Sequence, residues 1–130
     1  MTTRARVAEW LADYERAWRT TGTGGLGRLF SDDASYQLDP YEAPIKGLDG
    51  IGSMWERQRQ GPDEHFTMES TIIAVDSDIA VVRLEVRYEG PPPSQYRDLW
   101  ILEFDTAGRC RSFEEWPFWP DRESVDPITS

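Results

Sequence analysis

The sequence contains a single cysteine, a single histidine and no long apolar run. Cys110 alone cannot form an internal disulfide, and the N-terminus lacks the basic and apolar regions of a signal peptide, so we expect a cytoplasmic protein. A zinc site would need carboxylates beside the one histidine and one cysteine, and we expect neither a metal nor a cofactor. The longest apolar run is strand-sized, far below the roughly 20 residues of a membrane helix, so we expect no membrane partner.

Basic residues are also scarce. Fourteen lysines and arginines stand against 24 aspartates and glutamates, which gives a net charge of −10. Such a charge repels a phosphate backbone, and the arginines are spread singly rather than gathered into a stripe. We therefore expect no nucleic-acid partner.

Tryptophan is what the chain has in excess, with six indoles in 130 residues. Indoles concentrate in large cores or around ligand pockets and interfaces. The length suits one hydrophobic core, and the chain turns polar after Trp119. We expect a single domain over residues 1–120 and a flexible C-terminal tail over 121–130.

The apolar pattern predicts helices in the first half of the chain and strands in the second. Apolar side chains recur at helical spacing over Arg4–Arg19, and a short second helix carries Phe30 before Ser31-Asp32-Asp33 breaks it. A short strand follows at 34–38, and a third helix begins after Gly47 and is closed by Gly61-Pro62. Four strands with short, antiparallel connections fill the remainder, at 65–75, 79–89, 95–105 and 109–118.

This order of elements is an α+β arrangement in which three helices cover one face of a curved, mostly antiparallel sheet. One face of residues 79–88 is apolar and the other is charged, but both faces of residues 95–105 carry apolar side chains. Because the helices are available for only one face, a second copy of the chain is the simplest cover for the other. We therefore expect a homodimer.

Several segments resemble the SnoaL-like group of the nuclear transport factor 2-like superfamily, over about residues 4–120. The resemblance is carried by the helix with Trp10, Tyr14 and Trp18, by Leu29-Phe30-Ser31-Asp32-Asp33-Ala34, by residues 40–51 with Gly47, and by Phe104-Asp105 followed by Gly108-Arg109. It implies a cone-shaped α+β fold with a deep pocket between helices and sheet, commonly dimeric. Because this fold hosts isomerases, hydrolases, cyclases, ligand binders and adaptors, the resemblance implies a fold rather than a reaction.

A comparison with limonene epoxide hydrolases, within that superfamily, implies a set of catalytic residues. Those enzymes use an Arg-x-Asp on one strand, an Asp on the last strand, a Tyr and an Asn. Here Arg83-Leu84-Glu85 stands in the first position, Glu115 in the second and Tyr36 in the third. Both acids are glutamates, and the asparagine position falls on Leu38 or, with a one-residue shift, on Asp39.

Two carboxylates flanking an arginine in a pocket of low dielectric constant can take different pKa values, so that one acts as base and the other as acid. In this interpretation Glu115 and Glu85 carry protons, Arg83 sets their charge, and Tyr36 orients substrate or water. Alternatively, Arg83, Glu85 and Glu115 form an exposed ion-pair row worth about 0.2 to 1 kcal/mol.

The choice depends on which face of the sheet lines the pocket. Hydrophobicity places the face of Leu84 and Trp100 inside, which makes Asp98 the pocket acid. The resemblance places the face of Arg83 and Glu85 inside. A bulge in either strand would exchange the faces locally, so both alternatives stay open.

Aromatic and sulfur-containing side chains are expected to form the pocket walls, although an aromatic stripe can also be ordinary core. The expected ligand-binding residues are Tyr14, Trp18, Trp55, Phe66, Met68, Trp100 and Trp116. We expect a small hydrophobic ligand, flat and aromatic or polyketide- or terpene-like. The hypotheses are a cofactor-independent isomerase, cyclase or hydrolase using acid–base chemistry, a non-catalytic binding protein, and a structural dimerisation domain.

Overall fold

The computed structural model describes residues 2–59, 65–90 and 93–120. Over these residues the helices are α1 (Arg4–Arg19), α2 (Leu26–Leu29) and α3 (Gly47–Gln58). The strands are β1 (Phe30–Gln37), β2 (Ile45–Lys46), β3 (Phe66–Asp76), β4 (Ile79–Tyr88), β5 (Ser94–Phe104) and β6 (Cys110–Phe118). None of the helices within the described residues is both long enough and apolar enough to cross a membrane.

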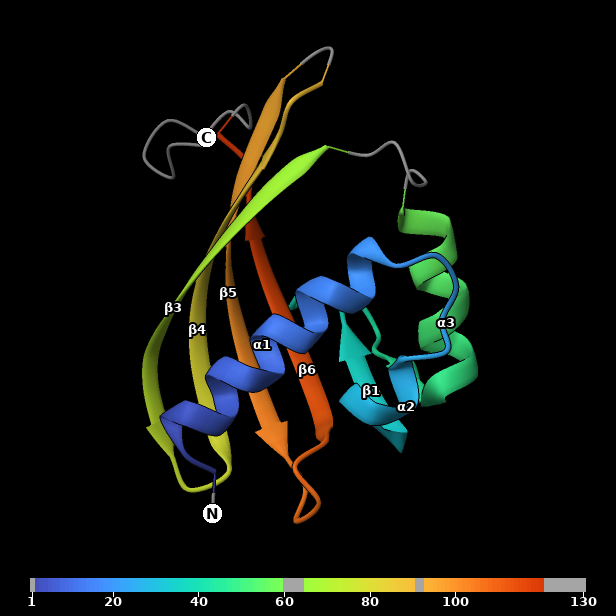
Figure 1. Ribbon diagram of the computed structural model, residues 1–130, viewed down its shortest axis with the longest axis vertical. Helices are drawn as coiled ribbons and strands as arrows, with labels where there is room; N and C mark the ends of the chain where they lie inside the picture. The colour runs from blue at the N-terminus through green and yellow to red at the C-terminus, as the bar shows by residue number, and fades with distance from the viewer. Residues whose placement is uncertain (1, 60–64, 91–92, 121–130) are drawn as a thin grey trace.

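The strands form one curved sheet in the order β2-β1-β6-β5-β4-β3 (Figure 1). The meander from β3 to β6 is antiparallel throughout, as the short connections predicted. Strand β1 adds to it by pairing in parallel with β6, and the two-residue β2 pairs antiparallel with β1. The α+β fold class with N-terminal helices on a curved sheet is confirmed.

The passage after α2 differs from the expectation. Helix α2 ends at Leu29, and the Phe30 N–H donates to Leu26 O while Phe30 itself is extended. Strand β1 begins at Phe30 and includes Ser31-Asp32-Asp33, which we expected to end the second helix ahead of a strand at 34–38. Asp32 and Asp33 are exposed, so their polar side chains do not oppose a strand there. The expected helix stop at Gly61-Pro62 and the tail at 121–130 lie outside the described residues.

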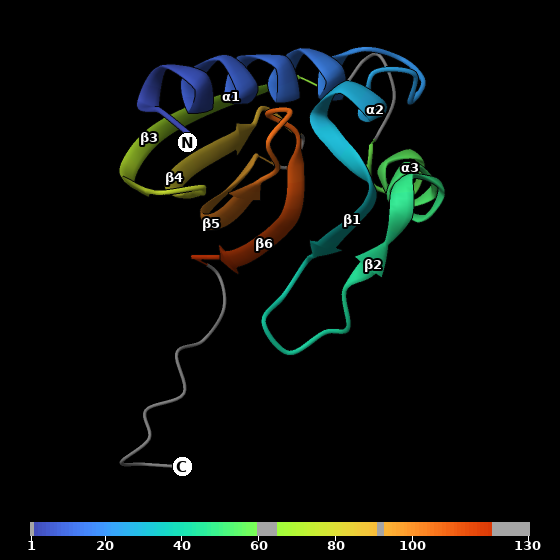
Figure 2. The same cartoon turned by 90° about the horizontal axis from the view of Figure 1, so that it is seen from below.

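Helix α1 lies across one face of the sheet, and α3 lies beside β1 and β2 (Figure 2). Helix α1 begins after Thr3, whose hydroxyl accepts a hydrogen bond from the Arg6 N–H at 3.2 Å. Its sheet-facing stripe is buried, and its two terminal arginines donate to main-chain oxygens of the edge strand β3. Arg4 reaches Ile72 O at 3.0 Å, and Arg19 reaches Phe66 O at 2.9 Å. These bonds fix the helix over the sheet.

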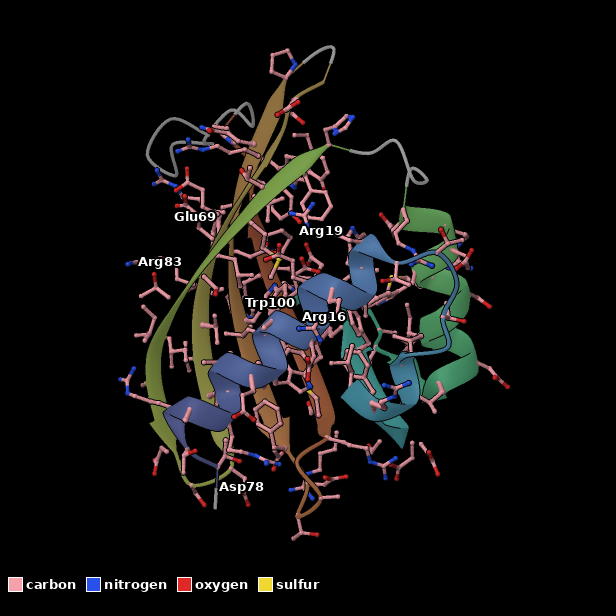
Figure 3. The ribbon with its side chains drawn as sticks, in the orientation of Figure 1. Arg16, Arg19, Glu69, Asp78, Arg83 and Trp100 are labelled. Carbon is pink, nitrogen blue, oxygen red and sulfur yellow. The ribbon has the colours of Figure 1, made fainter. Side chains whose placement is uncertain are left out.

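The inner face of the sheet is the apolar one. On β4, Val82 and Leu84 are fully buried whereas Arg83 is exposed. Figure 3 shows Arg83 pointing away from the helices and Trp100 on the side that α1 covers. The structure therefore agrees with the interpretation drawn from hydrophobicity, and the face that the resemblance placed inside is the outer one.

Candidate functional site

A cavity of about 830 Å³ lies between helices α1 and α3 and one end of the sheet. Five of the expected wall residues line it: Tyr14, Trp18, Phe66, Met68 and Trp100. Further aromatic side chains that the sequence analysis did not single out, Tyr88, Tyr96 and Trp119, extend this wall. Tyr96 was predictable, because it precedes Asp98 and Trp100 on the same face of its strand.

Two expected wall residues lie elsewhere. Trp55 is fully buried, and its ring packs 5.1 Å from the Tyr14 ring and 4.8 Å from the Trp18 ring, so it supports the wall from behind. Trp116 follows Glu115 on β6 and is 39% exposed on the outer face. Alternation along the strand allows only one of these two neighbours to face the pocket, and that one is Glu115.

Arg83 and Glu85 lie outside the pocket. Glu85 accepts a hydrogen bond from Arg87 Nε at 2.9 Å, and Arg97 Nε lies 4.0 Å from its other oxygen. The hydrogen bond from Arg87 is the main reason that the pKa of Glu85 is lowered from its ordinary value. Arg83 and Glu85 thus occupy a charged outer surface, while Glu115 is separated from them by the thickness of the sheet.

Glu115 and Asp98 meet on the inner face, with Trp100 beside them. Trp100 is the register partner of Glu115 across β5 and β6, and Asp98 lies two residues before Trp100 on the same face. Glu115 lines the cavity, whereas Asp98 is 1% exposed and lies behind it. The Trp100 Nε1–H donates to Asp98 Oδ2 at 3.1 Å.

The two carboxyl groups raise or lower each other's pKa. Burial raises the pKa of Glu115 well above its usual range, and the neighbouring Asp98 raises it further as hydrogen-bond acceptor and as negative charge. Burial also raises the pKa of Asp98, while its hydrogen bonds to Glu115 and Trp100 act in the opposite direction. The Trp100 indole lowers the pKa of Glu115 as well, but burial and Asp98 outweigh it, and the pKa of Glu115 stays well above its usual range. The arrangement therefore favours the proton of the pair on Glu115 and the negative charge on Asp98.

Two tyrosine hydroxyls complete the buried end of the cavity. Tyr14 Oη and Tyr36 Oη are 2.8 Å apart, and either can be the donor. Burial is the main cause that raises the pKa of both well above the usual value, so both keep their protons. Only one proton is used between them. The other hydroxyl proton is therefore available to a ligand oxygen in the cavity.

Asp39 is a further carboxyl group on the cavity wall. Its Oδ1 accepts a hydrogen bond from the Tyr41 N–H at 2.9 Å, a local turn that follows the end of β1. Sequence reasoning considered Asp39 only as a replacement for an asparagine. The Asp39-Pro40 pair, a turn signal directly after the expected strand, could have indicated an acid fixed beside the end of that strand.

Among residues 2–59, 65–90 and 93–120, no group of three or more His, Cys, Asp or Glu side chains could hold a metal ion.

The comparisons with known proteins agree with this architecture. A family model described as a SnoaL-like domain matches residues 8–113. No curated protein matches the sequence. Among solved structures, RV0760c from Mycobacterium tuberculosis is similar with a TM-score of 0.73 and 16% identity, covering 89% of this chain and 93% of that chain.

Two further solved structures are informative about what the fold can contain. An LEH-like epoxide hydrolase from M. tuberculosis has a TM-score of 0.64 and 15% identity, covering 88% of this chain and 84% of that one. A computationally designed 17-OHP binder has a TM-score of 0.67 and 16% identity, covering 86% of this chain and 91% of that one. At these identities the likeness shows the fold alone.

Proposed function

Because the chain belongs to the SnoaL-like domain family, we propose that it is a small enzyme that transfers protons to and from a hydrophobic metabolite bound in the pocket. The observation that supports this most directly is the position of Glu115 at the wall of an aromatic cavity, next to the buried Asp98, where burial raises its pKa well above the usual range. A neutral carboxyl group in such a place can donate a hydrogen bond or a proton to a ligand oxygen.

The arrangement of the pocket suits chemistry next to a carbonyl group. On ligand binding, the Glu115 proton would turn from Asp98 to the carbonyl oxygen. Together with the free hydroxyl proton of the Tyr14–Tyr36 pair it would stabilise the negative charge that develops there. Asp39 would accept a proton from the carbon next to the carbonyl group and return it to another carbon of the same ligand. No proton is gained or lost overall. An isomerisation or an intramolecular cyclisation fits this sequence of steps.

Hydrolysis is a weaker fit. The hydrolase comparison requires an amide side chain to hold the attacking water, and both Leu38 and Asp39 lack one. Arg83 and Glu85, which would supply the charged pair in that scheme, lie on the outer face of the sheet. Of the residues expected to be catalytic, Glu115, Asp98 and Tyr36 therefore remain in the proposal.

The ligand class follows from the walls. Aromatic rings from α1, β3, β4 and β5 face a cavity of about 830 Å³, which favours a flat hydrophobic molecule with one polar end. The structural neighbours include an epoxide hydrolase and a designed 17-OHP binder, so this fold is compatible with both catalytic and binding sites for small molecules.

The test uses 2-tetralone, a flat bicyclic ketone whose protons next to the carbonyl exchange with D₂O. Exchange followed by proton NMR should be faster with the protein than without it, and Glu115→Gln should lower the catalysed rate by about 100-fold. Glu114→Gln is the matched control, because Glu114 is bound by Trp116 Nε1–H and lies on the opposite face. Binding of the ketone without accelerated exchange would contradict the enzyme and favour a non-catalytic binding protein.

A further inference from the structure

The Asp98–Glu115 pair lacks a cationic partner within the described residues. The groups that influence the two carboxyls are each other, the Trp100 indole, and the tyrosines Tyr14 from α1, Tyr36 from β1 and Tyr96 from β5. The tyrosines remain neutral, because burial raises the pKa of each of them. A single negative charge on the pair therefore depends on neutral hydrogen-bond donors for its stabilisation.

The two oxygens of Asp98 have different surroundings. Oδ2 receives the Trp100 Nε1–H at 3.1 Å. Oδ1 is buried, and no N–H group or hydroxyl of the described residues donates to it. Two carboxyl groups can share a hydrogen bond only when one of them carries a proton, so the proton on Glu115 is the donor that remains for Oδ1.

We propose that Trp100 is a positioning residue which, by donating its indole N–H to Asp98, keeps the negative charge on the buried carboxylate and the transferable proton on the cavity-facing Glu115. Because an indole N–H can donate but cannot accept, it stabilises an anion and offers nothing comparable to a protonated oxygen. The indole lies near both carboxyls and lowers the pKa of Glu115 too, but its 3.1 Å hydrogen bond is made to Asp98. Without it, the proton would be free to move to Asp98. Glu115 would then face the cavity as an anion and could not act as the acid. The catalytic consequence rests on the proposed function, but the location of the proton does not.

The experiment compares Trp100→Phe with wild type. Phenylalanine retains a ring against Tyr14 and Phe113, whose ring centroids lie 4.7 Å from that of Trp100, and removes only the donor and part of the indole. Trp55→Phe is the matched control. Trp55 belongs to the same aromatic cluster, but its Nε1 is buried without a hydrogen-bond partner among the described residues, so the substitution removes an indole and no hydrogen bond.

The readout is the carbon-13 NMR signal of labelled Asp and Glu side-chain carboxyls as a function of pH, in protein without ligand. Glu115→Gln and Asp98→Asn assign the two signals. In wild type and in Trp55→Phe, Glu115 should show a protonated carboxyl near neutral pH and Asp98 a carboxylate. In Trp100→Phe, the protonated signal should move to Asp98 for most of the molecules. An unchanged distribution in Trp100→Phe, or a protonated Asp98 in wild type, would overturn the role of Trp100.

A second measurement does not depend on whether Trp100→Phe folds. In wild type, the Trp100 indole N–H proton resonance should move to high field when low pH protonates the Asp98 carboxylate, and it should lie there at all pH values in Asp98→Asn. A resonance that is the same in both proteins and insensitive to pH would overturn the proposal.

Kinetics separate this proposal from the proposed function. If 2-tetralone is turned over, Trp100→Phe should lower kcat by about tenfold and shift the pH profile of kcat, and Trp55→Phe should leave that profile in place. A redistributed proton without any turnover in wild type would refute the enzyme and support the role of Trp100. Turnover with an unshifted pH profile in Trp100→Phe would support the enzyme and refute the role of Trp100.

Discussion

A half-buried acid at the wall of a pocket, Glu115, and a fully buried one beside it, Asp98, are costly for the folded state. In the unfolded chain, Glu115 and Asp98 would ionise at ordinary values of about 4. In the folded protein, burial raises the pKa of both. Between the ordinary and the raised values, the folded state binds more protons than the unfolded state. The contribution of the pair to stability is therefore greatest at low pH and is lost as the pH rises through this interval.

Glu115→Gln should remove much of this dependence. The amide keeps the shape and can donate to Asp98, but it does not ionise. We expect the free energy of unfolding of the variant, relative to wild type, to rise from pH 4 to pH 8 and to exceed it at neutral pH by on the order of 1 kcal/mol. Urea denaturation at several pH values measures this difference, with Glu114→Gln as the parallel control. A difference that is constant with pH would contradict raised values for the pair.

At the scale of secondary structure, the position of α1 over the sheet depends on its last turn. The Arg19 guanidinium donates to Phe66 O on β3, lies 4.0 Å from the centroid of the Phe66 ring and pairs with Glu15 at 3.0 Å. Phe66 also lines the cavity. The same side chain thus joins the helix, the edge strand and the pocket wall, and it covers a main-chain oxygen that an edge strand would otherwise leave open.

Arg19→Met should lower the free energy of unfolding by about 0.5 to 1 kcal/mol, because it retains the apolar stem but removes a charge-assisted bond at a partly exposed site. Arg16→Met serves as the comparison. Arg16 lies on the same helix and forms an exposed i,i+3 ion pair with Asp13. We therefore expect the free energy of unfolding of this variant to change by close to zero. Midpoints of urea unfolding measure both. Equal effects of the two substitutions would show that the contact of Arg19 with β3 does not stabilise the fold.

The elements that the sequence predicted well are those whose pattern is local. The stripe of α1 and the alternation of β4 require only neighbouring residues, and both have the expected bounds within one residue. Strand β1 is different, because its partner β6 lies some eighty positions later, as in the pair Phe30 and Cys110. A parallel pairing at that distance leaves little local signal, and acidic residues at the start of β1 suggested a break instead.

The candidate site was predictable in part for the same reason. Alternation along β5 places Asp98 and Trp100 on one face, which the sequence shows directly. That Glu115 joins them depends on the register between β5 and β6, which shifts at Glu103 and Phe104. A register shift is a contact between strands and cannot be counted from one strand alone. The resemblance pointed to Glu115, which lines the cavity, but it placed Arg83 and Glu85 on the side of the sheet that the structure shows to be the outer one.

At the scale of the whole molecule, the outer face of the sheet is unusually apolar for a surface. Leu99, Ile101, Trp116 and Phe118 are 38%, 36%, 39% and 58% exposed and lie on adjacent strands β5 and β6. Around them are side chains of both signs, among them Arg83, Arg97, Arg111, Glu85 and Glu103. In a chain with a net charge of −10, a face with balanced charges is where a second copy meets least repulsion.

We therefore propose that this outer face forms a homodimer. Leu99→Glu should give a monomer of about 15.0 kDa in sedimentation equilibrium, where wild type gives twice that mass. The new carboxylate would lie beside Arg83, its register partner, so the isolated sheet tolerates it, whereas burial against a second copy would be unfavourable. Tyr41→Glu is the control, because Tyr41 is a fully exposed aromatic residue on the connection between β1 and β2 rather than on β5 or β6. Since Leu99 and Glu115 lie on opposite faces, 2-tetralone binding should persist in the monomer, and a wild type that sediments as a monomer at the same concentration would refute the interface.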